Sequence, residues 1–158
     1  NTPEAFGLFE SQRFGEKSGE KIFYTQQEAL FLVQTSRMEI FNLQNKKLAE
    51  KEILKRFEKT DKKFKIKYLV FKDLRENGYI VKTALKFGAE FRVYEKGKKI
   101  GTDHAKWILF PVSETQALTW QDFSAKNRIA HSTNKNLLIA IVDEENEVSY
   151  YEVNWTRI

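Results

Sequence analysis

The 158-residue sequence contains no cysteine, and only two histidines and two prolines. The absence of cysteine excludes disulfide bonds, a thiolate nucleophile and cysteine ligands for zinc or iron–sulfur clusters. No apolar run approaches the ~18–20 residues that a membrane-spanning helix needs, so we expect no membrane contact. We find no signal peptide and expect a cytoplasmic protein, with an N-terminus that begins at Asn1 rather than methionine and is trimmed or processed.

Hydrophobic residues make up 41% of the chain and charged residues 31%, which is typical of a globular protein rather than a disordered one. The formal net charge of +5 favours a polyanionic partner, although an ordinary lysine-rich surface has the same charge. Residues 46–67 contain ten basic and four acidic residues, a net charge of +6. This basic segment is either a solvated helix face or a surface for RNA or for an acidic loop of a partner.

The first part of the chain is predicted to combine a small hairpin with helices. Phe6–Phe9 and Ile22–Tyr24 are short apolar pieces on either side of a glycine-bearing turn, the pattern of a hairpin. Thr25, followed three residues later by Glu28, is a capping-box pattern that begins a helix. Further helices are predicted at 46–59 and from about 62 to 77.

From residue 79 onward the pattern changes to strands, with one more helix from a capping box at Thr119 to about His131. The predicted strands are 79–85, 89–95, 107–112, 135–142 and 148–155. Helices around a mostly central sheet predict an α/β fold for this half. We place a domain boundary at residue 62, which divides the chain into an N-terminal mixed α/β domain (1–62) and a C-terminal domain (63–158).

The stretch from Lys86 to His104 has the residues most suited to chemistry. Its strand alternates so that Tyr94 shares a face with Arg92, and a basic loop containing Gly97, Lys98, Lys99 and Gly101 then leads to His104. Together with Lys135, the tyrosine and histidine form a metal-free set suited to moving protons and holding a phosphate.

The residues FGAEFRVY, the later His104 and the segment from Arg128 through Lys135 into LLIAIVDEENEVSYYEV resemble the tRNA-splicing endonuclease family, above all its archaeal catalytic subunits. The resemblance covers residues 68–155 well and the N-terminal part more weakly. It implies an α/β/α catalytic domain, similar to restriction-endonuclease folds, behind a smaller mixed N-terminal domain. It also implies an endoribonuclease (a tRNA-intron lyase) that acts on pre-tRNA at bulge–helix–bulge junctions.

The resemblance assigns a role to each catalytic residue. Tyr94 is implied as the general base for the 2′-hydroxyl, His104 as the general acid for the leaving 5′-oxygen, and Lys135 as the charge that stabilises the transition state. The expected products are a 2′,3′-cyclic phosphate and a 5′-hydroxyl, with no metal and no cofactor. Because a phenol has a reference pKa of about 10, Tyr94 either has a pKa lowered by nearby cations or only orients the 2′-hydroxyl. Read without the resemblance, each of the three is a packing, loop or strand-edge residue.

Other residues are candidates for RNA binding. The resemblance implies that Arg128 stacks on a bulged base, and Trp155 is a second stacking surface unless it serves core or interface packing. Lys106 and Lys98–Lys99 are possible phosphate contacts. His131 is better explained by its favourable place near a helix end. A non-catalytic subunit of the same assembly is the alternative function, and a metal-dependent DNA nuclease is disfavoured because we find no convincing Asp…Glu-x-Lys set.

The acidic turn formed by Asp143, Glu144 and Glu145 has three alternative interpretations. Adjacent carboxylates in a turn are a metal site or, more commonly, simply solvated. The resemblance implies instead a loop that inserts into a basic cleft of a neighbouring subunit, for which the basic segment at 46–67 is a complement. The last strand is apolar on both sides, as expected if a second subunit covers it. We therefore expect a homo- or hetero-oligomer of endonuclease subunits, arranged as a dimer of dimers.

Overall fold

A computed structural model describes residues 2–98 and 101–158, so Lys99 of the basic loop lies outside the described residues. The chain divides into two compact units, residues 1–65 and 66–158. In the described part, no helix combines the length and apolar character that crossing a membrane requires.

The first unit contains helix α1 (Pro3–Gln12), a two-stranded hairpin, and helices α2 (Gln26–Gln34) and α3 (Glu50–Thr60). The hairpin is formed by β1 (Glu16–Ser18) and β2 (Lys21–Phe23). The prediction that Phe6–Phe9 belongs to the hairpin is wrong, because these residues lie within α1. Thr2 caps that helix by accepting a hydrogen bond from the Ala5 N–H, and Pro3 occupies its first turn, where proline is well tolerated.

The boundaries of α2 and α3 follow from their caps. The predicted capping box of Thr25 and Glu28 is confirmed, and the same carboxylate accepts a bond from the Gly15 N–H, so the buried Glu28 also anchors the hairpin. Helix α3 begins at Glu50 instead of the predicted residue 46. The side chain of Asn42 accepts bonds from two backbone N–H groups, at positions 44 and 46, and holds this segment in a turn that delays the helix.

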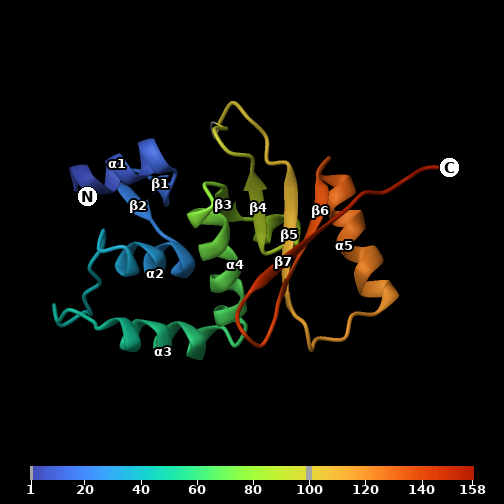
Figure 1. The fold of residues 1–158 in the computed structure, drawn as a ribbon. Helices are drawn as coiled ribbons and strands as arrows, with labels where there is room; N and C mark the ends of the chain where they lie inside the picture. Colours follow the sequence, from blue (N-terminus) through green and yellow to red (C-terminus); the bar gives the residue numbers. More distant parts are fainter. Residues whose placement is uncertain (1, 99–100) are drawn as a thin grey trace. The chain divides into compact units, whose positions relative to one another are not determined.

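The second unit is a five-stranded sheet between two helices (Figure 1). Its elements in chain order are α4 (Phe64–Glu76), β3 (Ile80–Thr83), the 3₁₀ turn η1 (Leu85–Phe87), β4 (Phe91–Tyr94), β5 (Trp107–Ser113), α5 (Trp120–Ser132), β6 (Asn136–Val142) and β7 (Val148–Val153). The sheet order is β3-β4-β5-β6-β7, and only β5 and β6 are parallel. The predicted α/β class is confirmed.

Each face of the sheet packs against one helix. On the α5 face, Ile108 and Leu137 are completely buried and form one cluster with Ala130 of the helix. On the opposite face, the ring of Phe91 contacts that of Phe71 on α4, with 6.2 Å between centroids. The alternation of side chains along β4 therefore sends Phe91 and Val93 toward α4, and Arg92 and Tyr94 toward α5.

The hydrogen-bond ladder aligns one end of three central strands. The Lys106 N–H donates to the Val93 carbonyl over 2.9 Å, and the Asn136 N–H donates to the Lys106 carbonyl over 3.0 Å. Since β4 runs against β5 and β5 runs with β6, the end of β4 lies beside the starts of β5 and β6. This shared end of the sheet positions the candidate site.

Candidate active site

The backbone brings the three predicted catalytic residues to the same end of the sheet. Tyr94 is the last residue of β4, His104 lies three residues before β5, and Lys135 immediately precedes β6. In residues 2–98 and 101–158, no hydrogen bond joins these three side chains to one another. The fold thus gathers the residues around a shared end of the sheet.

Tyr94 is largely buried, with 4% of its surface exposed. The Arg92 guanidinium carbon lies 6.0 Å from the centroid of its ring. Tyr94 Oη has no hydrogen-bond partner among the described residues. The only side-chain nitrogen or oxygen in that part of the chain that is both fully buried and without a hydrogen-bond partner is Arg92 Nε, so Tyr94 Oη is not fully buried. The Tyr94 hydroxyl therefore keeps some access to solvent, although the ring is packed into the protein.

Lys135 is fixed by both its backbone and its ammonium group. Its backbone N–H donates to the Ala130 carbonyl in the last turn of α5, and its Nζ donates to the Thr133 carbonyl over 2.8 Å. Partial burial lowers the pKa of Lys135 from its ordinary value, and the positive charge of Arg92 lowers this pKa further. The ammonium group is thus held near a second cation instead of being neutralised by a carboxylate.

His104, Lys98 and Lys106 are exposed. Lys106, predicted as a phosphate contact, forms an ion pair with Glu95 at 2.9 Å and lies 4.7 Å from the centre of the Trp107 ring. Its hydrogen bond to Glu95 raises the pKa of Lys106. A phosphate would compete with that carboxylate, so Lys106 is less available than Lys135 to an anion.

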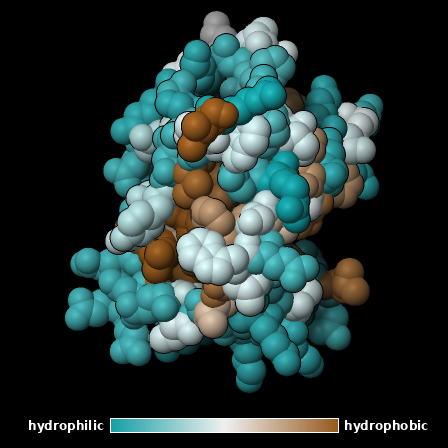
Figure 2. Space-filling model, turned by 90° about the vertical axis from the view of Figure 1, so that its right-hand side faces the viewer, coloured by the Kyte–Doolittle hydropathy of each residue, from teal (hydrophilic) through white to brown (hydrophobic). Residues whose placement is uncertain are grey.

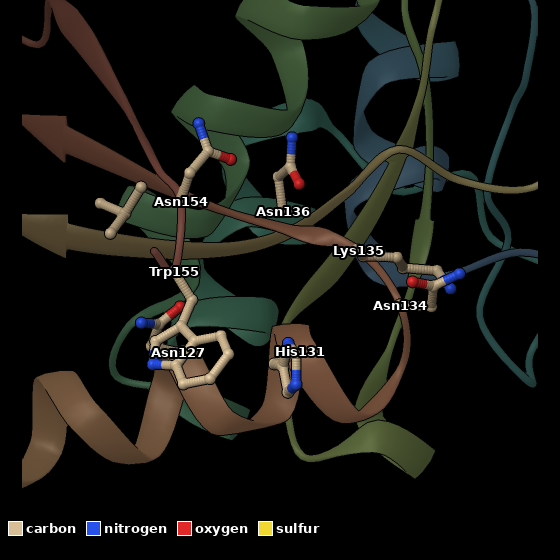
Figure 3. Close-up of a pocket in the computed structure, with 8 residues that line it drawn as sticks. Asn127, His131, Asn134, Lys135, Asn136, Asn154 and Trp155 are labelled. Carbon is tan, nitrogen blue, oxygen red and sulfur yellow. The ribbon is translucent and has the colours of Figure 1, made fainter. Parts of the chain in front are cut away.

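A pocket of about 160 Å³ lies beside Lys135, between the end of α5 and the C-terminal residues (Figure 3). Its wall includes Asn127, His131 and Trp155, and the rings of His131 and Trp155 are 4.9 Å apart between centroids. Figure 3 shows the indole ring of Trp155 pointing from the C-terminal segment toward α5, where it lies beside Asn127. A cavity of ~150 Å³ holds one benzene ring, so this pocket accommodates a single ring system.

Two features of this region were missed in the sequence. The sequence explains His131 by its helix end alone, whereas in the structure its ring also contacts that of Trp155. The last strand was predicted to include Trp155, but β7 ends at Val153, so Trp155 lies beyond the strand. The sequence shows only that Arg92 shares a strand face with Tyr94, whereas the structure shows that its Nε has no hydrogen-bond partner among the described residues. Arg128 lies exposed on α5, one turn before His131.

The acidic turn is ordered by its own hydrogen bonds. The Asp143 carboxylate accepts a bond from the Glu147 N–H over 2.8 Å, and the Glu144 N–H donates to the Glu114 carboxylate. Asp143 is consequently partly buried, whereas the carboxylates of Glu144 and Glu145 are exposed. The segment between β6 and β7 therefore presents the side chains of Glu144, Glu145 and Glu147 to solvent.

Comparison with known proteins assigns this chain to a family. Residues 64–150 match the family of the tRNA intron endonuclease catalytic C-terminal domain. The tRNA-splicing endonuclease of Pyrococcus abyssi is 41% identical over 150 residues, which cover 95% of this chain and 85% of that protein. The enzyme of the same name from Nanoarchaeum equitans is 41% identical over 136 residues, covering 82% of this chain and 86% of the relative.

A further relative, the tRNA-splicing endonuclease of Methanothermobacter thermautotrophicus, is 48% identical over 91 residues, covering 58% of this chain and 54% of the relative. The match to the family covers more than half of the chain, and the similarity to the Pyrococcus protein extends over nearly all of it. The protein therefore belongs to the tRNA-splicing endonuclease family, and the resemblance in its sequence to archaeal members is confirmed.

Proposed function

We propose that this chain is a catalytic subunit of a tRNA-splicing endonuclease and cleaves pre-tRNA at the intron–exon junctions. The observation that carries the proposal is the alignment of Tyr94, His104 and Lys135 at one end of the sheet in the domain that matches the family. A non-catalytic subunit would have no need of all three groups at one place. The proposed active site therefore belongs to residues 63–158, and residues 1–62 form a separate N-terminal domain.

The proposed reaction is a transesterification within the RNA. The 2′-oxygen next to the scissile phosphate attacks phosphorus and loses its proton, with Tyr94 acting as the base or orienting the hydroxyl. The bond from phosphorus to the 5′-oxygen breaks, and His104 donates a proton to that oxygen. Lys135 stabilises the charge that develops on the non-bridging oxygens. A 2′,3′-cyclic phosphate and a 5′-hydroxyl result, and no metal enters these steps because the nucleophile comes from the substrate.

The proposed substrate is the bulge–helix–bulge, in which two bulges flank a rigid helix. Unpaired bases are recognised in RNA by stacking on aromatic rings and on guanidinium planes. Arg128 is exposed on α5, which ends three residues before Lys135, and Trp155 lines the pocket beside Lys135. We propose that these two residues hold a bulged base near the cleaved bond.

The substrate proposal is tested with two RNA transcripts. An intron-containing tRNA with both bulges is expected to be cut at its two junctions. A matched transcript, in which added nucleotides pair with each bulge, is expected to remain intact under the same conditions. Equal cleavage of both transcripts, or no cleavage of either, would contradict this assignment.

We also propose that the chain assembles through β7. This strand lies at the edge of the sheet, so one row of its backbone groups is open to pairing. On the α5 face, Val112, Ile141 and Val153 are only partly buried, and Tyr151 is 56% exposed. Figure 2 shows hydrophobic side chains gathered in a stripe on the side of the molecule that carries α5. A two-fold contact along this edge would bury these groups in both copies.

In this proposal two such dimers associate with each other. The exposed acidic turn of a subunit in one dimer contacts the basic segment 46–67 of a subunit in the other dimer. The mass in solution should therefore be a multiple of one chain, alone or with a second endonuclease subunit. Tyr151→Asp places like charges opposite each other at the two-fold contact and should lower the mass, whereas Trp120→Asp, at a residue 83% exposed on α5, should not. A parent protein with the mass of one chain under all these conditions would rule out the assembly.

A further inference from the structure

Arg92 is a partly buried guanidinium that no carboxylate neutralises. Its Nε is fully buried and has no hydrogen-bond partner in the described ranges 2–98 and 101–158, and no ion pair involves Arg92 there. Buried donors are almost always paired, because an unpaired one loses its hydrogen bonds to water without replacement. Among the described residues, it is the only fully buried side-chain nitrogen or oxygen without such a partner.

The neighbours of Arg92 add positive charge. The residue directly opposite it on β3 is Lys82, which is 7% exposed. Lys135 is the other cation near Arg92, close enough for their repulsion to act on its ammonium group. The Arg92 guanidinium also lies beside the ring of Tyr94. The α5 face of the sheet end thus concentrates positive charge that the surrounding protein leaves uncompensated at Arg92.

A bound anion would remove both costs. The Nε–H and an adjacent terminal N–H of a guanidinium form a fork that matches two oxygens of a phosphate, whereas an ammonium group acts as a point charge. We propose that Arg92 donates hydrogen bonds to a phosphate of the RNA and forms, with Lys135, a two-cation site for that group. The identification of this phosphate as the scissile one rests on the proposed function, since Tyr94 and Lys135 flank the same position.

This assignment differs from a purely structural role for Arg92. A structural arginine stabilises the fold through its own pairs, so its removal lowers the unfolding temperature. An arginine retained for anion binding, next to Lys135, creates repulsion in the free protein. Arg92→Met keeps most of the aliphatic stem and removes the charge, so we expect an unfolding temperature equal to or higher than that of the parent.

Inorganic phosphate provides a test that does not depend on RNA cleavage. The Nε–H resonance of Arg92 is assigned by NMR as the signal that disappears in Arg92→Lys, and phosphate is then titrated at constant ionic strength against sodium chloride. We expect this resonance to shift and saturate with phosphate but not with chloride. The resonance of Arg37, an exposed residue whose Nε–H already donates to Thr35 Oγ1, serves as the reference and should show no saturable shift.

Cleavage kinetics provide the second arm. We expect Arg92→Met to reduce the single-turnover rate by about 10- to 100-fold, the scale for losing a charge-assisted hydrogen bond, with Arg92→Lys between the two. If the Arg92 resonance did not shift with phosphate, or if Arg92→Met cleaved RNA as fast as the parent, Arg92 would not be a phosphate-binding residue. Either result would leave the proposed function intact. A saturable shift in a parent protein that cleaves no RNA would support the anion site and contradict the proposed function.

Discussion

Replacing Lys135 with alanine is expected to slow cleavage by about 10²–10³-fold or more, the scale seen when a group that stabilises a developing negative charge is lost. The ammonium group is held at the sheet end by its hydrogen bond to the Thr133 carbonyl, and among the described residues no ion pair joins it to a carboxylate that would compete with a phosphate. Single-turnover rates with saturating enzyme measure this effect. RNA binding, followed with a transcript whose 2′-hydroxyl at the junction is removed, is expected to remain largely intact.

The matched control for this variant is Lys126→Ala. Lys126 lies on α5, with its ammonium 4.8 Å from the centre of the Phe110 ring, so its removal deletes the same charge from the helix that precedes Lys135. We expect Lys126→Ala to cleave within a few-fold of the parent. Equal cleavage rates for Lys135→Ala and the parent would eliminate the role given to Lys135. If Lys135→Ala weakened RNA binding as much as it slowed cleavage, Lys135 would be a binding residue rather than a catalytic one.

Replacing His104 with alanine is expected to slow cleavage by about 10²–10⁴-fold, because general acid catalysis contributes that much when the leaving group is a poor one. His104 is exposed, so its removal should leave the fold unchanged. Its role can be separated from that of Lys135 with a substrate whose leaving 5′-oxygen is replaced by sulfur. A thiolate leaves without needing a proton, so His104→Ala should cleave this substrate nearly as fast as the parent does.

The sulfur substrate also contains its own control. Lys135→Ala should remain slow on it, since the phosphate still develops charge when sulfur leaves. If sulfur restored both variants equally, or neither, the division of labour between an acid and an electrostatic group would be wrong. Rescue of His104→Ala alone would place the proton donor at that residue.

Local signals in the sequence predicted much of the fold. The pairing of Thr25 with Glu28, and of Thr119 with Asp122, marks helix starts that the structure reproduces, because both side chains of each box satisfy N–H groups of the first turn. The apolar run before the acidic turn becomes the buried strand β6. The segment Phe6–Phe9 failed because a short apolar run fits a strand or a helix, and the Thr2 cap with Pro3 decided for the helix.

The active-site set, in contrast, came from the resemblance rather than from periodicity. Spacing along the chain does not reveal that the end of β4 lies beside the starts of β5 and β6, since that depends on strand order. Ion pairing is equally invisible: Lys106 is engaged by Glu95, whereas Arg92 has no such partner among the described residues. These contacts depend on side-chain geometry across strands, and they determine which cations remain available to RNA.

The chemistry of the cut ends shows which oxygen atom attacks the phosphorus. The protein is incubated with an intron-containing tRNA transcript in EDTA, and the new ends are analysed by their reactivity toward acid, phosphatase and kinase. The account predicts undiminished cleavage that leaves a 2′,3′-cyclic phosphate and a 5′-hydroxyl at each junction. Cleavage that requires Mg²⁺, or that leaves a 3′-hydroxyl and a 5′-phosphate, would contradict it, because water rather than the neighbouring 2′-oxygen would then be the nucleophile.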